Sequence, residues 1–218
     1  VVRGNQVAGP SVLVVGAVSS MPKLIVERII APALTAELPM RVRCHESSLE
    51  QLLADLAVHR LDIVLSDQPM PRGLNLRAYN HLLGESSLSF FTLRSKARRH
   101  RNRFPQSLND APMLLPSQHS ALRRLMDDWF EDQGLSPRIA GEFDDSALMK
   151  AFGEAGAGIF AAPTVIEEEI CRMYRMAVIG RTDAIKESFY AISPERRLKH
   201  EGVLHVTETA RSELFSGS

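Results

Sequence analysis

The chain has 218 residues, 44% of them hydrophobic, and its 26 lysines and arginines balance 26 aspartates and glutamates. This ordinary globular mixture excludes a disordered, collagen-like or disulfide-dense chain. A self-sufficient nucleic-acid binder usually carries a basic surplus, which is absent here. The sequence also contains no run of about 18 apolar residues, the length that would predict a membrane span. Cys44 and Cys171 lack metal-ligand spacing, which favours reduced thiols in a cytoplasmic protein. Because the chain starts at Val1 without an initiator methionine, we expect a fragment of something longer.

In chain order, the first third alternates apolar strands with helical patterns. Strands are expected over 12–16, 40–44 and 61–66, with helices after Pro22 and after a capping box at Ser47-x-x-Glu50. This β-α-β-α-β order implies right-handed crossovers and a parallel sheet. A loose stretch rich in proline and glycine over 68–84 predicts a connection to a second unit.

A second α/β set follows this connection. Strands are expected over 88–93, 112–115, 138–143, 159–162, 176–179 and 188–192. Helices are expected over 117–133, after Asp145, after a capping box at Thr164-x-x-Glu167, and from near His200 to Phe215. Two such lobes form a cleft, and ligands of open α/β sheets bind outside the carboxyl ends of the strands.

Polar residues gather at those strand ends. Ser19 and Ser20 precede one helix, and Ser117 to Ser120 place two hydroxyls, an amide and an imidazole before another. Free backbone N–H groups at a helix start attract anions or neutral polar groups. Capping explains one serine in each turn, and ligand contact is the alternative for the others.

The stretch from Gly141 to Pro163 predicts a strand, an acidic corner, a helix, a glycine turn and a strand. Asp145 suits helix capping, whereas Asp144 is the better candidate for contact with a ligand or cation. No nucleophile elbow, HExxH pair or other catalytic constellation is found, so we expect no enzyme and no cofactor. The basic run Arg94–Arg103 is interpreted as a solvated segment rather than a nucleic-acid patch.

The whole pattern resembles the effector-binding domain of LysR-type transcriptional regulators, from about Ser11 to Phe215. The resemblance is carried by VLVVGAVSSMPKLIVERIIAPAL, by HRLDIVLSD, and by GEFDDSALMKAF with GAGIFAAP. Further sequence segments resemble those of the family members that activate the sodium/proton antiporter gene. These segments are RCHES, LGESSLSFF, FAAPT, IGR and ERRLKH.

The resemblance implies an α/β, periplasmic-binding-protein-like (type II) fold with two Rossmann-like lobes, joined by crossing strands around an interlobe cleft. Lobe I would comprise residues 11–83 plus 184–215, and lobe II residues 84–183. The family's N-terminal winged helix-turn-helix is absent from this chain, so DNA would be bound only through that missing domain. The resemblance also implies a homodimer of this domain, a tetramer of the full-length protein, and no membrane partner.

By position in the family, an effector site is expected at the strand ends and helix starts. Its residues would be Ser19, Ser20, Met21, Ser66, Asp67, Ser117, Gln118, His119, Ser120, Phe143, Asp144 and Asp145. The subfamily resemblance suggests sodium, with pH, as the signal, and the candidate cation ligands are Asp67, Glu142 and Asp144. A small organic anion fits the Ser117–Ser120 turn equally well. A solute-binding protein, or a small-molecule enzyme on the same scaffold, is the alternative.

Overall fold

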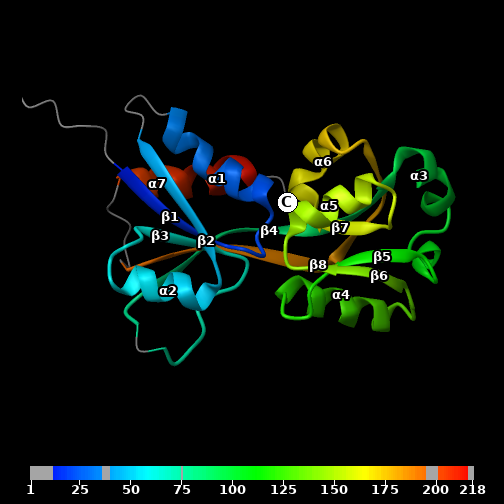
Figure 1. Cartoon of the computed structure of the whole chain (residues 1–218), viewed down its shortest axis with the longest axis horizontal. Coiled ribbons are helices and arrows are strands. Elements are labelled where there is room, and N and C mark those ends of the chain that lie inside the picture. Colours follow the sequence, from blue (N-terminus) through cyan, green and yellow to red (C-terminus); the bar gives the residue numbers. More distant parts are fainter. Residues whose placement is uncertain (1–11, 36–39, 75, 195–200, 216–218) are drawn as a thin grey trace, which may run out of the picture.

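Two long strands, β4 (Tyr79–Leu93) and β8 (Met176–Ser193), run through both halves of the molecule. The computed structural model describes residues 12–35, 40–74, 76–194 and 201–215, which form two α/β lobes side by side (Figure 1). The six-stranded sheet has the order β2-β1-β3-β8-β4-β7, and a two-stranded sheet has the order β5-β6. The predicted start of the last helix, His200, lies outside the described residues.

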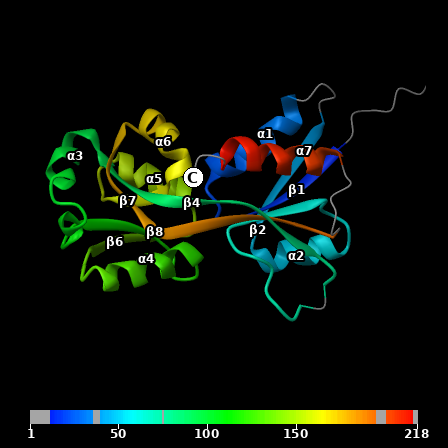
Figure 2. The same cartoon turned by 180° about the vertical axis from the view of Figure 1, so that it is seen from behind.

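Lobe I is built on three parallel strands, as the sequence predicted. β1 (Val12–Val18) pairs in parallel with β2 (Arg41–Ser47) and β3 (Ile63–Ser66). Helices α1 (Lys23–Thr35) and α7 (Glu201–Thr209) cover one face of this sheet and α2 (Leu49–Ala57) covers the other (Figure 2). The apolar run of β1 is buried between these two layers, which explains why it lacks a polar alternation.

Lobe II surrounds the other ends of the two long strands. It contains β5 (Pro112–Pro116), β6 (Arg138–Phe143), β7 (Phe160–Pro163), α3 (Arg94–Arg101), α4 (Ala121–Asp132), α5 (Ser146–Glu154) and α6 (Glu167–Met173). β5 and β6 are parallel, and a bridge between Met113 and Ile159 connects β5 to the segment that leads into β7. Phe90 of β4 lies 5.3 Å from the ring of Trp129 on α4, which anchors the lobe's own core.

Pairing along β4 and β8 shows how the lobes are joined. Val64 of β3 pairs with Ile192 near the end of β8, whereas Leu88 of β4 pairs with Pro163 of β7. Along the β4–β8 pair the register shifts at three places, between Leu82 and Gly84, between Ser86 and Leu88, and between Phe90 and Phe91. Such irregularities bend and twist a strand pair, so the crossing strands form a bent link between the lobes.

Several predicted element limits were wrong for identifiable reasons. The predicted strands 176–179 and 188–192 are one strand, because the residues between them pair with β4. In the same way, 88–93 is only the end of β4, whose first residues fall in the predicted connection 68–84.

Both predicted capping boxes were also wrong. Helix α2 is capped by Ser48, whose hydroxyl accepts from the Gln51 N–H at 3.3 Å, while Ser47 ends β2. Thr164 begins a 3-10 turn, and its hydroxyl lies 2.9 Å from that of Ser89.

Candidate functional site

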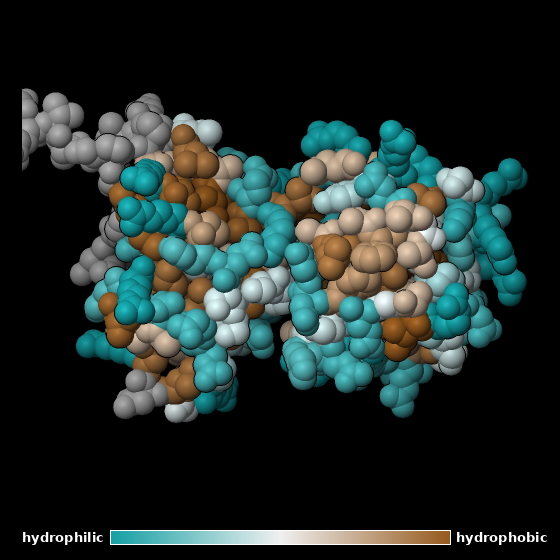
Figure 3. All heavy atoms as spheres, in the orientation of Figure 1, coloured by the Kyte–Doolittle hydropathy of each residue, from teal (hydrophilic) through white to brown (hydrophobic). Residues whose placement is uncertain are grey.

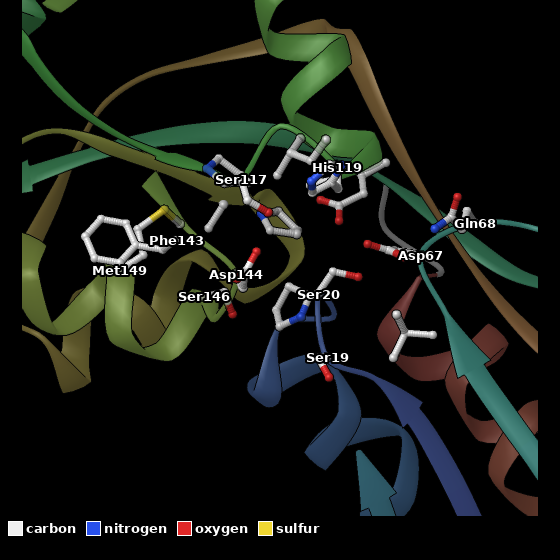
Figure 4. Close-up of a pocket in the computed structure, with 18 of the residues that line it drawn as sticks. Ser19, Ser20, Asp67, Gln68, Ser117, His119, Phe143, Asp144, Ser146 and Met149 are labelled. Atoms are coloured by element: carbon white, nitrogen blue, oxygen red, sulfur yellow. The ribbon is translucent and has the colours of Figure 1, made fainter. Parts of the chain in front are cut away.

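A cavity of about 320 Å³ lies between the lobes, at the carboxyl ends of the parallel strands (Figure 4). This volume falls in the range of small-molecule sites. Lobe I contributes Val18, Ser19, Ser20, Pro22, Ser47, Ser48, Leu49, Asp67 and Gln68. Lobe II contributes Pro116, Ser117, His119, Ser120, Leu122, Phe143, Asp144, Ser146, Met149, Lys150, Ala161, Ala162 and Pro163, and the crossing strand β8 contributes Glu187.

Four helices begin at this cavity: α1, α2, α4 and α5. Their first backbone N–H groups carry partial positive charge toward the space between the lobes. Some of this hydrogen-bonding capacity is already used, because Asp145 accepts from the Ala147 N–H at 2.7 Å and Ser48 caps α2. The hydroxyl of Ser120 makes no capping bond at the start of α4.

The structure brings eight of the twelve predicted site residues together on the cavity wall: Ser19, Ser20, Asp67, Ser117, His119, Ser120, Phe143 and Asp144. The other four lie beside the cavity. Met21 is fully buried in the lobe I core, and Gln118 is exposed outside the lining. The Ser66 hydroxyl donates to the Gln68 carbonyl at 2.7 Å, and Asp145 caps α5.

The candidate cation ligands are separated in the structure. Asp67 and Asp144 line the cavity, but Glu142 does not, because its carboxylate lies 3.2 Å from the Arg123 guanidinium. Within the described parts of the chain, no three His, Cys, Asp or Glu side chains lie close enough together to hold a metal ion.

Two buried ionisable residues of the site were missed by the sequence analysis. Lys150 is 2% exposed, its ammonium donates to the Ser146 hydroxyl at 3.3 Å, and burial lowers its pKa to about 8. Glu187 is 4% exposed, and burial together with the nearby Asp67 raises its pKa to about 8. The four-residue spacing of Ser146 and Lys150 could have indicated a shared helix face, whereas Glu187 lies between two segments predicted as separate strands.

Asp67 is the third buried ionisable residue of the site. It directly follows β3, and its side chain is 7% exposed. Burial raises the pKa of Asp67, and the smaller effects of Ser20 and Arg124 lower it. Figure 4 shows the Asp67 carboxylate and the Ser20 hydroxyl directed toward each other. Among the described residues, neither Asp67 Oδ1 nor Glu187 Oε2 has a hydrogen-bond partner.

Arg123 holds the lobe II wall of the cavity in place. Its side chain is 5% exposed and donates to Asp127 at 2.9 Å, to the Pro116 carbonyl at 3.0 Å and to Glu142 at 3.2 Å. These bonds tie α4 to the ends of β5 and β6, so they position the turn that carries Ser117.

Replacing Arg123 by Met is expected to lower the free energy of unfolding by about 1–2 kcal/mol, because a partly buried carbonyl and two partly exposed carboxylates lose their donor. Urea denaturation measures this loss. Arg98→Met on the exposed face of α3 is the matched control and should change stability by less than about 0.5 kcal/mol. Equal stabilities for the two variants would show that the Arg123 network does not hold the wall.

Two α/β lobes that are joined by crossing strands around a cavity define a periplasmic-binding-protein-like fold of type II, as predicted. The chain belongs to the LysR substrate binding domain family, whose family model matches residues 9–214. It is 35% identical over 202 residues to the transcriptional activator protein NhaR of Escherichia coli K12, and equally to that of Shigella flexneri. The matched segment covers 93% of this chain and 66%, just under two thirds, of each relative.

Solved structures of the family share the fold. HinK, a LysR family transcriptional regulator from Pseudomonas aeruginosa, superposes with a TM-score of 0.72 at 16% identity, over 96% of this chain and 71% of that one. The effector binding domain of QuiR in complex with shikimate gives a TM-score of 0.68 at 14% identity, over 94% and 97%. In the described ranges, no helix combines the length and apolar character needed to cross a membrane.

Proposed function

We propose that this chain is the effector-sensing regulatory domain of a cytoplasmic LysR-type transcriptional activator. The observation that carries the proposal is the cavity at the junction of the lobes, whose wall combines apolar surface with serine, acidic and lysine side chains, in a chain 35% identical to a transcriptional activator. DNA would be bound by a winged helix-turn-helix outside these residues. Lobe I would comprise 11–83 plus 184–215, and lobe II 84–183.

A ligand in this cavity would act by changing the angle between the lobes. Lobe I offers Ser20 and Asp67, and lobe II offers Ser117 and Ser120, so one small polar molecule or ion can contact both. The irregular β4–β8 pair would bend as the lobes close. A ligand shifts this equilibrium only if it binds the closed and open arrangements with different affinity.

The signal that we propose is sodium, with pH, and the regulated gene is that of a sodium/proton antiporter. The subfamily resemblance supports this, as do the buried carboxyl groups on the cavity wall, since hard cations prefer oxygen ligands. A small organic effector is the second candidate, because the volume of about 320 Å³ exceeds that of one ion.

Thermal unfolding of the purified chain in NaCl, against KCl at equal ionic strength, tests sodium binding. Sodium at ten times its Kd would stabilise the chain by about 1.4 kcal/mol, which corresponds to a rise in Tm of roughly 3–6 °C. Identical Tm values in the two salts would contradict direct sodium sensing by this domain.

We also propose that the domain forms a homodimer and that the full-length protein forms a tetramer. Apolar side chains gather on the front of lobe II around α5 (Figure 3), where Leu148 and Phe152 are 51% and 46% exposed. Exposed apolar patches of this kind often mark protein interfaces.

Replacing Phe152 by Glu is expected to shift the domain toward monomer, with at least a tenfold rise in the dimer dissociation constant, because a charge would enter an apolar contact. Sedimentation equilibrium measures this constant. Leu74→Glu on a lobe I loop, at a similarly exposed leucine, is the control for added charge alone. An unchanged constant for Phe152→Glu would remove α5 from the interface.

A further inference from the structure

Two buried carboxyl groups at the junction of the lobes each have one oxygen without a hydrogen-bond donor among the described residues. Asp67 follows β3 in lobe I, and Glu187 lies on the crossing strand β8. Both line the interlobe cavity, and both side chains are more than nine-tenths buried. A buried acceptor without a donor costs about 1–3 kcal/mol, and more when it is charged. Neither oxygen receives a hydrogen bond from the described residues, so a bound group that interacts with both would remove this cost.

Several charged side chains surround this pair. Lys150 is a buried cation of the cavity wall that is attracted by Asp145 and by Glu187, but the hydrogen bond of its ammonium goes to the Ser146 hydroxyl and not to Glu187 Oε2. The side chain of Arg124 is exposed, and its positive charge favours the ionised form of Asp67. The other ionisable side chains that line the cavity or act on these groups are Asp144, His119 and Lys23. Because burial raises the pKa of Glu187 to about 8, this carboxyl group keeps its proton near neutral pH, and a bound positive charge would favour the ionised form and release that proton.

We propose that Asp67 and Glu187 together bind a positively charged group, either Na⁺ or the ammonium of a small organic effector. This inference rests on the proposed effector site and names the chemistry that the site recognises. Both carboxyl groups fall within lobe I, and Ser117 and Lys150 of lobe II line the same cavity, so a bound positive charge changes the attraction between the two walls and favours one arrangement of the lobes. An anion would instead disfavour the ionised form of both carboxyl groups.

The two sources of positive charge make different demands on the site. With no third acidic, His or Cys side chain nearby in the described residues, Na⁺ would complete its shell with the Ser20 hydroxyl, carbonyl oxygens and water. An ammonium group has three N–H donors, enough for one open oxygen on each carboxyl group. The remaining cavity would then hold the rest of an organic molecule.

Binding of NaCl and of methylammonium chloride to the purified chain, each measured by thermal unfolding against a KCl background of constant ionic strength, tests the proposal. At least one probe should stabilise the wild-type chain, and Asp67→Asn and Glu187→Gln should each weaken that binding by about tenfold or more, since charge-assisted bonds are lost. Asp132→Asn and Glu154→Gln, two exposed acids at the far ends of α4 and α5, are the matched controls and should bind within twofold of wild type.

The carboxyl carbon resonances of Asp67 and Glu187 in the wild-type chain give a readout that needs no substitution. Both should shift on addition of the probe that binds. A wild-type chain that binds neither probe, or variants that keep wild-type affinity, would overturn the proposal. Methylammonium binding that is lost in the variants, without sodium binding, would support this site and refute sodium as the signal. Sodium binding that both variants keep would refute this site and leave sodium as the signal.

Discussion

Replacing Glu187 by Gln is expected to flatten the pH dependence of stability between about pH 5 and 8. The folded chain holds the Glu187 proton up to about pH 8, whereas the ordinary value in an unfolded chain is 4.5. Between these values the folded state binds more protons, so wild-type stability falls as pH rises, by up to about 1.4 kcal/mol per pH unit. The neutral Gln does not titrate, so the variant lacks this slope and is more stable than wild type at pH 8.

Lys150 makes the free energy of unfolding rise with pH at higher pH, opposite to the effect of Glu187. Its folded pKa of about 8 lies below the ordinary 10.5, so the unfolded chain binds the extra proton and stability rises again above pH 8. Urea denaturation in KCl buffers from pH 5 to 10 should therefore show a minimum near pH 8 for the wild type. Lys150→Met should lose the rise above that minimum. If the stability of Glu187→Gln depends on pH in the same way as that of the wild type, burial does not raise the pKa of Glu187 as described.

Replacing Gly84 by Ala is expected to lower the free energy of unfolding by about 2–3 kcal/mol. A methyl group there would lie 2.3 Å from Cβ and Cγ of Phe215, whose ring stacks 5.4 Å from that of Phe189. The buried Phe215 ring would have to move, and overpacking of this kind usually costs 1–3 kcal/mol. The change acts where the C-terminal segment packs on the crossing strands.

Gly134→Ala is the matched control for this substitution. Gly134 ends helix α4 with a φ of +62° and has open space around it, so only backbone strain of about 1 kcal/mol is expected. Urea denaturation compares the two variants. If Gly84→Ala is no more destabilised than Gly134→Ala, Phe215 does not pack against β4 as described.

The parallel half of lobe I could be predicted because local patterns and tertiary structure agree there. Buried strands such as β1 are continuous apolar runs, and the helices between them carry clear apolar faces. The crossing strands could not be predicted in full. The middle of β8 contains exposed Arg181, Asp183 and Lys186, which are typical of a loop, and its pairing partner in β4 is about 100 residues away in the sequence.

The candidate site likewise contains residues that could be predicted from the sequence and residues that could not. Helix starts such as Ser20 and Ser120 could be placed at the cavity, because the carboxyl ends of parallel strands gather at one edge of a sheet. Glu187 and Lys150 could not, because their burial results from contact between segments far apart in the sequence. Glu142, a predicted cation ligand, is instead paired with Arg123, and no local pattern distinguishes these two roles.

The most direct test of the interlobe cavity as the effector site is a transcription measurement with the full-length protein. Ser120→Trp would fill the cavity from the start of α4, whereas Ser95→Trp places the same ring on the exposed face of α3. Antiporter-gene transcript is measured after addition of NaCl or of KCl at equal osmolarity. We predict that Ser120→Trp abolishes the sodium-specific response and that Ser95→Trp retains it. A wild-type response from Ser120→Trp would contradict the assignment of this cavity as the sensor.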